Sequence, residues 1–142
     1  MKKKIYIAGP LFNQHERDYL EAIALNLEKE GFNCFLPHRD LTGVDKSELK
    51  TTSMSQNIKN KIFVADLFAL KEADLTVALI TGWDIDSGTS AEIGYTFANG
   101  KPIIGIDASE RRFRNLFVEG MITEKVHDIS AIIPAIKKIF SE

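Results

Sequence analysis

Two acidic side chains frame a glycine near the middle of the chain, in residues 86–92 (DSGTSAE). Asp86 and Glu92 lie six residues apart, with Gly88 between them. Carboxyl groups in such a pair can act as nucleophile, general acid or general base. The preceding apolar run 75–80 is short and rich in branched residues, which is typical of a strand buried on both faces of a parallel sheet. Because ligands bind at the carboxyl ends of such strands, we expect the chemistry here.

Further polar side chains are expected at the same edge of the sheet. Tyr6 and Gly9 lie in and just after an expected first strand, and the ends of neighbouring parallel strands converge on one crevice. Asp66 lies in an expected helix, on the face that also carries Leu70 and, less directly, Phe63. Asp66 is therefore either an exposed edge residue or an acid held against the core with a raised pKa.

An alternation of strands and helices must position these residues. Apolar runs and helical periodicity predict strands at 4–8, 32–36, 75–80, 102–106 and 125–126, and helices at 14–30, 55–72, 89–99, 111–117 and 130–140. The inward face of the second helix is expected to carry Ile58, Ile62, Phe63, Leu67 and Leu70. The polar stretch 38–52 should form a loop or short irregular helices. The whole pattern predicts an α/β, doubly wound, flavodoxin-like parallel sheet of five strands flanked by helices, in a single domain of residues 1–142.

Composition narrows the classes of partner and compartment. Of the 142 residues, 44% are hydrophobic and 27% are charged, which suffices for one core. A formal net charge of −2 gives no reason to bind polymeric nucleic acid. The first apolar segment, 5–8, is too short for a signal peptide or a membrane span. The lone Cys34 lies in an apolar run and is expected to be a buried thiol, so we expect a cytoplasmic protein outside any membrane.

Familiar cofactor signatures do not occur in the sequence. There is no GxGxxG fingerprint after the first expected strand, no GxxxxGKS/T loop and no paired Cys/His spacing. We therefore expect neither a cofactor nor a metal ion. The carboxylates remain as the groups that carry chemistry.

Four motifs follow one another along the chain. They are residues 6–13 (YIAGPLFN), Asp66-Leu67 spaced before Ala73-Asp74, residues 86–95 (DSGTSAEIGY) and Asn115-Leu116. Together they resemble the nucleoside 2-deoxyribosyltransferase family, over roughly residues 4–126. The same superfamily includes the 2′-deoxynucleoside 5′-monophosphate N-glycosidases and related pyrimidine nucleotide hydrolases, which share the acid pair. The resemblance therefore implies action on an N-glycosidic bond, by transfer or by hydrolysis.

The residue roles implied by the resemblance also make chemical sense. Cleavage of an N-glycosidic bond passes through an oxocarbenium-like state at C1′, which a carboxylate on one face and a proton donor near the base both favour. Glu92 is expected to attack C1′ and form a covalent deoxyribosyl-enzyme, from which a second base takes the sugar with net retention. Asp66 is expected to protonate the departing base and deprotonate the incoming one. Tyr6 would hold the rotamer of Glu92 by a hydrogen bond.

The resemblance also implies how the sugar is held. Asp86 would accept a hydrogen bond from the 5′-hydroxyl, and Asn115 from a neighbouring subunit of a homo-oligomer would complete this contact. The expected substrate-binding set further includes Gly9, Pro10, Phe12 and Gly88. Expected substrates are 2′-deoxyribonucleosides and free nucleobases, and the helix after Ser55 is a candidate interface element.

Charge bears on the choice between a nucleoside and a nucleotide. The anion of Asp86 would repel a 5′-phosphate by about 4 kcal/mol at an effective dielectric constant of about 20. The basic cluster Arg111–Arg114 could offset this repulsion, unless it is a solvated helix face. Transfer of 2-deoxyribose between bases is the leading interpretation. Hydrolysis of a nucleoside or a nucleoside 5′-monophosphate is the alternative, and a non-catalytic nucleotide-binding module is the third.

A transferase must keep water away from the covalent sugar. The candidate apolar walls are Phe12, Trp83, Phe117 and Met121. Trp83 in particular would be exposed unless it covers substrate or a partner subunit. The resemblance places recognition of the base in the loop 38–52, where the candidates are His38, Arg39 and Asp40.

Overall fold

A computed structural model of the protein describes residues 2–41, 54–107 and 114–141. Most of the polar stretch 38–52 lies outside these ranges, as do residues 111–113 of the basic cluster. What the sequence predicts for those residues stays a prediction.

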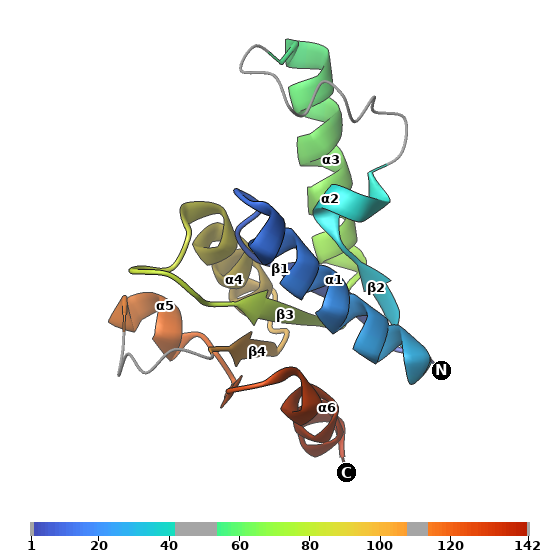
Figure 1. Ribbon diagram of the computed structural model, residues 1–142, viewed down its shortest axis with the longest axis vertical. Coiled ribbons are helices and arrows are strands. Elements are labelled where there is room, and N and C mark those ends of the chain that lie inside the picture. Colours follow the sequence, from blue (N-terminus) through green and yellow to red (C-terminus); the bar gives the residue numbers. More distant parts are fainter. Residues whose placement is uncertain (1, 42–53, 108–113, 142) are drawn as a thin grey trace.

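Five parallel strands form one sheet in the order β2-β1-β3-β4-β5 (Figure 1). They are β1 (Lys4–Ala8), β2 (Asn33–Phe35), β3 (Leu75–Leu79), β4 (Ile103–Ile106) and β5 (Glu124–Val126). Every residue of the central strand β3 is buried, because both faces of the sheet are covered, and this explains its continuous apolar run. The predicted flavodoxin-like α/β sheet is confirmed.

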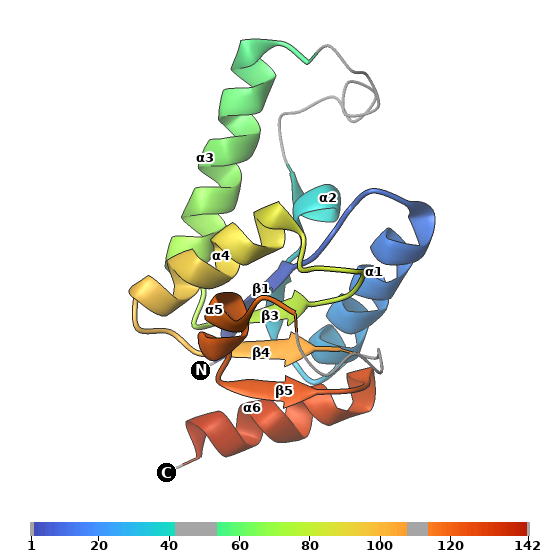
Figure 2. The same cartoon turned by 90° about the vertical axis from the view of Figure 1, so that its left-hand side faces the viewer.

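Helices cover the sheet in two layers, which Figure 2 shows from the side. They are α1 (Gln14–Lys29), α2 (Pro37–Asp40), α3 (Gln56–Glu72), α4 (Ser87–Ala98), α5 (Leu116–Gly120) and α6 (Ile132–Phe140), with a 3₁₀ turn at Ile129–Ala131 before α6. One core lies between the sheet and α1 and α6. The second core lies on the opposite face, under α3, α4 and α5. The first turns of α3 project beyond the sheet in both views.

Side-chain caps decide where the helices around the strand ends begin. Four helices start after a residue whose side chain accepts a hydrogen bond from the first turn, namely Asn13, Ser55, Asp86 and Asn115. At α1 two hydrogen bonds cap the helix. Asn13 accepts from the backbone N–H of Glu16, and the side chain of Glu16 accepts from the backbone N–H of Phe12. The caps at Asn13 and Asp86 lie in the loops after β1 and β3, and these two loops carry most of the predicted substrate-binding residues.

Two predictions about the helices are wrong. Phe63 was expected to face inward, but its side chain is 65% exposed. Its neighbours Val64 and Phe68 are also exposed, and they line a cavity beside β1 and β2. Residues 111–113 of the predicted helix 111–117 lie outside the described residues, whereas Arg114 and Asn115 precede α5, which starts at Leu116. Arg114 precedes this helix and is buried rather than solvated.

The described residues contain no helix that is both long and apolar enough to cross a lipid bilayer. Cys34 is buried in β2, as its apolar surroundings predicted, and burial raises the pKa of its thiol to about 12. A thiol of this kind is a packing residue rather than a reactive one.

Candidate active site

Tyr6 and Glu92 form the centre of the candidate site. Tyr6 lies in the middle of β1, is fully buried, and stacks on the ring of Phe35 with centroids 5.7 Å apart. Its hydroxyl donates a hydrogen bond to Oε2 of Glu92, which lies in the second turn of α4. Burial and the negative charge of Glu92 raise the pKa of Tyr6 well above its ordinary value, so the phenol stays a donor. The structure thus joins two residues that are far apart in the sequence.

The carboxyl group of Glu92 has a pKa close to neutral pH. Burial raises its pKa to about 7, and the charges of Asp66 and Asp86 act in the same direction. The hydrogen bond from Tyr6 opposes this shift, because it favours the ionised form. Three acidic side chains from α3 and from the start of α4 therefore lie close enough to influence one another.

Asp66, on α3, lies near the carboxyl group of Glu92. Burial raises the pKa of its carboxyl group to about 6, and its Oδ1 atom is buried with no hydrogen-bond partner among the described residues. Of the two placements that helical spacing allowed, the structure shows the acid held against the core. A carboxyl group with this pKa can carry a proton near neutral pH and give it up again.

Asp86 caps the N-terminus of α4. Its Oδ2 accepts hydrogen bonds from the backbone N–H of Thr89 at 3.1 Å and from the Thr89 hydroxyl at 3.0 Å. A Cβ added at Gly88 would lie 3.4 Å from Oδ2, which is an ordinary van der Waals contact. The packing in this turn therefore does not by itself require the glycine between the two acids. The cap fixes where the anion of Asp86 sits.

The loop after β1 combines a tight packing residue with an exposed ring. A Cβ at Gly9 would lie 2.7 Å from Cδ2 of Leu20 and 3.1 Å from Cβ of Leu79, so glycine lets α1 approach the strand ends. Pro10 is buried behind it. Phe12 is 79% exposed in the isolated chain. Gly9 thus has a packing role whether or not it also touches a substrate.

Asn115 lies at the exposed start of α5. Its Oδ1 accepts hydrogen bonds from the backbone N–H groups of Phe117 and Val118, at 3.0 Å and 3.1 Å. Within residues 2–41, 54–107 and 114–141, no hydrogen bond connects Asn115 to the acidic group. The geometry of one chain therefore accounts for Asn115 as a helix cap.

Arg114 belongs to a buried ion pair that the sequence interpretation missed. Its guanidinium donates to both carboxylate oxygens of Asp107, at 2.8 Å and 3.4 Å, and to the carbonyl of Gly82 at 3.1 Å. The prediction that Arg114 lies on a solvated helix face is wrong. An acid directly after the buried strand β4 is the signal that could have indicated its partner. The pair ties the loop after β3 to the start of α5.

A cavity of about 690 Å³ lies beside Asp66, between the loop after β1, α1, α2 and α3. Its lining includes Leu11, Phe12, Glu21, His38, Ile62 and Asp66. Nε2 of His38 and Oε2 of Glu21 are 3.0 Å apart. Of the three predicted base-recognition residues, His38 is the one that lines this cavity.

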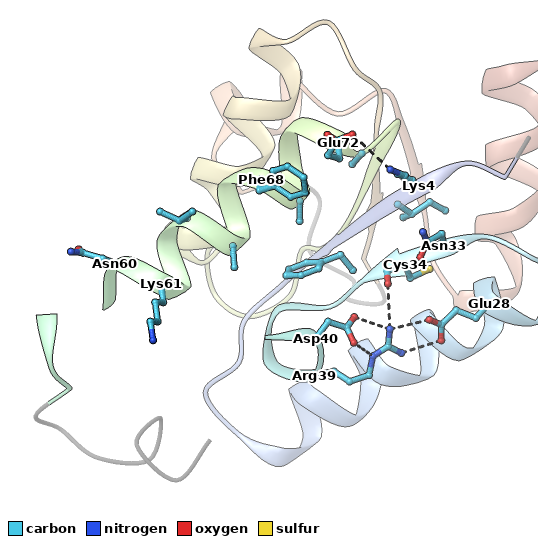
Figure 3. Close-up of a pocket in the computed structure, with 16 residues that line it drawn as sticks. Lys4, Glu28, Asn33, Cys34, Arg39, Asp40, Asn60, Lys61, Phe68 and Glu72 are labelled. Carbon is cyan, nitrogen blue, oxygen red and sulfur yellow. Dashed lines mark hydrogen bonds and ion pairs between the residues drawn. The ribbon is translucent and has the colours of Figure 1, made fainter. Parts of the chain in front are cut away.

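Arg39 and Asp40 point to a different cavity, of about 1010 Å³, on the outer side of β2 (Figure 3). Arg39 donates to both carboxylate oxygens of Glu28 and to Asp40, and Asp40 accepts from the backbone N–H of Leu36. These bonds hold β2 and α2 against α1. Although this cavity is the larger of the two, neither Glu92 nor Asp66 lines it.

The four candidate wall residues differ in burial. Trp83 is 83% exposed, Phe117 is 80% exposed, and Phe12 is similarly open, whereas Met121 packs against the core under α5. The sequence analysis expected Trp83 to be exposed unless substrate or a partner subunit covers it, and in the isolated chain it is exposed. The described residues contain no group of three or more His, Cys, Asp or Glu side chains that could hold a metal ion.

Comparisons with solved structures find proteins of similar fold. The chain is similar to a conserved protein from Enterococcus faecalis V583, with 24% identity, a TM-score of 0.80, and coverage of 99% of this chain and 100% of that chain. It is similar to a 2-deoxyribosyltransferase from Bacillus psychrosaccharolyticus, with 25% identity, a TM-score of 0.77, and coverage of 91% and 89%. It also shares its fold with the CMP N-glycosidase BcmB from Clostridium botulinum, at 22% identity, a TM-score of 0.60, and coverage of 97% and 100%.

Comparison with curated proteins finds no match. The sequence profile described as Nucleoside 2-deoxyribosyltransferase, in contrast, matches residues 5–131, which include every predicted site residue. With this match over most of the sequence, the chain belongs to the nucleoside 2-deoxyribosyltransferase family.

Proposed function

We propose that this protein transfers 2-deoxyribose between nucleobases through a covalent intermediate on Glu92. The observation that carries the proposal is the cluster between β1, α3 and α4, where Tyr6 donates to Glu92 and Asp66 has a buried carboxyl oxygen. A nucleophile with a fixed rotamer and a separate proton donor are what cleavage of an N-glycosidic bond requires.

The first half of the reaction breaks the bond between C1′ and the base. An oxygen of the ionised Glu92 carboxylate forms a bond to C1′ as the C1′–N bond breaks. The proton of Asp66 passes to the departing base, which leaves as a neutral molecule. Tyr6 keeps the second carboxylate oxygen of Glu92 in place by its hydrogen bond.

The second half reverses these steps with a new base. The incoming base gives its N–H proton to Asp66 as its nitrogen attacks C1′ from the side that the first base left. The C1′–O bond breaks and Glu92 is released as a carboxylate. Two inversions at C1′ give net retention.

The protonation states set a pH window for this chemistry. The first step needs Glu92 ionised, which requires a pH near or above its pKa of about 7. It also needs Asp66 protonated, which requires a pH near or below its pKa of about 6. The productive combination is therefore most populated between pH 6 and pH 7 in the empty site.

A nucleoside fits the charges of the described residues better than a nucleotide. The Asp86 carboxylate at the start of α4 is suited to accept a hydrogen bond from a 5′-hydroxyl and would repel a 5′-phosphate. Arg114, the one member of the basic cluster that the structure describes, is engaged by Asp107. Its charge is thus already balanced inside the protein.

The substrate site is proposed to be completed by a second copy of the chain. Exposed apolar side chains lie on α3 and around the candidate site, which is unfavourable for a free monomer. They include Phe63, Val64 and Phe68 on α3, and Trp83, Leu116 and Phe117 near the loops. Asn115 precedes the last two and would approach the Asp86 of a neighbouring subunit with them.

Hydrolysis is the second candidate. The high exposure of Phe12, Trp83 and Phe117 favours it, because in the isolated chain these rings do not enclose the site. Water could then take the place of the incoming base. Closure by a partner subunit would instead favour transfer.

A chromatographic assay distinguishes the two reactions. Purified protein is incubated with 2′-deoxyinosine, with and without free adenine, and in parallel with 2′-deoxynucleoside 5′-monophosphates and ribonucleosides. We expect 2′-deoxyadenosine to form only when adenine is present. Release of free base and sugar without any new nucleoside, above all from a monophosphate, would contradict transfer and establish the hydrolase.

A further inference from the structure

Two buried threonines that have no part in the proposed chemical steps join α4 to the sheet. Thr76 lies in β3 and Thr96 in α4, and the two residues are 0% and 3% exposed. Their hydroxyl oxygens are 2.8 Å apart. Valine has nearly the shape of threonine and would fill either position without the cost of burying a hydroxyl group. The two hydroxyl groups therefore need an explanation beyond packing.

A second hydrogen bond of Thr96 fixes the direction of the first. The Thr96 hydroxyl donates to the backbone carbonyl of Glu92 at 2.8 Å. A hydroxyl group has a single hydrogen, so Thr96 has none left for Thr76. Thr76 is therefore the donor to Thr96. The two bonds form a directed chain from β3 through Thr96 to the main chain of Glu92.

Thr76 is also the neighbour of Tyr6 in the sheet. In the parallel pairing of β1 with β3, Tyr6 lies opposite Thr76. Both side chains face α4, since Tyr6 donates to the carboxyl group of Glu92 and Thr76 donates to Thr96. Two adjacent positions of the sheet therefore hold the same glutamate. One binds its carboxyl group directly, and the other binds its backbone carbonyl through Thr96.

A glutamate side chain is long and flexible, so a hydrogen bond to its carboxyl group alone leaves the rest of it free to move with the helix. Reacting groups must be held to within about 0.5 Å, which requires support from residues behind them. We propose that Thr76 and Thr96 are positioning residues, which hold the turn of α4 that carries Glu92 at the distance from Tyr6 that attack on C1′ requires. The inference rests on the proposed function, because it takes Glu92 as the nucleophile.

Removal of either hydroxyl group should lower kcat rather than raise KM. Thr76→Val removes the bond between β3 and Thr96, and Thr96→Val removes both bonds of the chain. We expect kcat for exchange of adenine into 2′-deoxyinosine to fall by at least about tenfold, since a misplacement of about 1 Å can cost about 100-fold. KM should change by less than about twofold, because neither variant alters the cap that holds Asp86.

The titration of Glu92 gives a second readout, which does not depend on turnover. The hydrogen bond from Tyr6 lowers the pKa of Glu92, whereas burial and the charges of Asp66 and Asp86 raise it, to about 7 in all. When the turn is no longer held, the bond from Tyr6 weakens while both charges remain, so the pKa of Glu92 should rise above its wild-type value. Carbon-13 NMR of the Glu92 carboxyl group, identified by its absence from Glu92→Gln, measures this pKa.

A double variant separates positioning from stability. Thr96→Val leaves the buried hydroxyl of Thr76 without its acceptor and should destabilise the fold, whereas Thr76→Val combined with Thr96→Val should recover that stability in urea unfolding. The kcat of the double variant should stay low. Thr96→Ser keeps the hydroxyl group and should keep the wild-type kcat. Thr123→Val is the matched control, because its hydroxyl oxygen accepts from the backbone N–H of Ile103, on the side of Thr76 away from Tyr6.

Two results would overturn the inference. One is a double variant with the wild-type kcat and the wild-type pKa of Glu92, and the other is a kcat that falls in the single variants but recovers with stability in the double variant. Failure of the proposed function is distinguishable from both. If the reaction is hydrolysis, kcat for base release replaces kcat for exchange, and if the wild type has no turnover, the pKa of Glu92 in the variants decides the inference alone.

Discussion

At the scale of single residues, the acids were found from the sequence but their surroundings were not. Glu92 and Asp86 could be predicted because they follow a buried strand in a turn with glycine. Asp66 was left between an edge and a core position, since helical spacing does not report how deeply a face is buried. The pair of His38 and Glu21 was not predicted, because it joins α2 to α1 across 17 residues of sequence.

Glu92→Gln should abolish turnover and stabilise the fold at alkaline pH. In the folded protein the pKa of Glu92 rises from 4.5 to about 7, so the folded state loses stability as pH rises between these values. Glutamine cannot ionise and escapes this loss. We expect the variant to be more stable than the wild type by about 3 kcal/mol at pH 8, and equal to it below about pH 4.

Urea unfolding of both proteins at several pH values checks this prediction. The stability difference should grow between about pH 4.5 and pH 7 and then stay constant. A difference that does not depend on pH would show that burial does not raise the pKa of Glu92. Substantial residual activity of the variant would reject Glu92 as nucleophile.

Asp66→Asn should be rescued by a base that needs no proton. With 2′-deoxyinosine the variant should lose on the order of 10²- to 10⁴-fold in kcat/KM, because general acid catalysis is gone. With 7-methyl-2′-deoxyguanosine the base already carries a positive charge, so the loss should be less than about tenfold. Initial rates, corrected for spontaneous release, measure both. Equal losses on the two substrates would mean that Asp66 does not protonate the base.

At the scale of elements, strands were easier to predict than the segment before α5. Buried parallel strands are continuous apolar runs, so local sequence suffices to find them. Arg114 looked like part of a basic helix, because its partner Asp107 and the Gly82 carbonyl come together only in the fold. Phe63 was misplaced because α3 is apolar on two faces and the spacing alone does not show which one meets the sheet.

Arg114→Met should strongly destabilise the protein. The side chains of Arg114 and Asp107 are 0% and 3% exposed, so the variant removes the guanidinium that donates to both oxygens of a buried carboxylate. We expect a loss of about 3–5 kcal/mol in urea unfolding. Lys138→Met is the matched control, because its ion pair with Glu124 is exposed and should contribute less than about 1 kcal/mol.

A double variant separates the charge from the packing. Arg114→Met combined with Asp107→Leu removes both charges and should recover most of the lost stability. If the double variant is as unstable as Arg114→Met alone, the contact with the Gly82 carbonyl, rather than the buried charge, accounts for the loss.

At the scale of the whole molecule, the fold class follows from the alternation of elements, whereas the assembly does not. A flavodoxin-like sheet accounts for both apolar cores. It does not account for the exposed rings of Phe63, Phe68 and Phe117. Local sequence cannot distinguish a side chain that packs inside one chain from a side chain that packs between two chains.

Mixing two inactive variants tests whether sites are shared. Glu92→Gln and Asn115→Asp are refolded together, the latter chosen because aspartate keeps the cap of α5 but lacks the amide donor. If each site of a dimer uses Asn115 of the other subunit, random mixing restores about 25% of the sites. Activity no higher than the mean of the two separate variants would place Asn115 and Glu92 in the same chain's site.

The contact between Tyr6 and Glu92 spans 86 positions of the sequence and joins β1 to α4. Neither residue can meet the other until β1 has paired with β3, the strand that leads into α4, and this pairing is non-local. Turnover during recovery from denaturant consequently follows the arrival of the completed fold, while circular dichroism also reports the earlier local helices. The rate at which activity recovers therefore measures the rate of the last stage of folding.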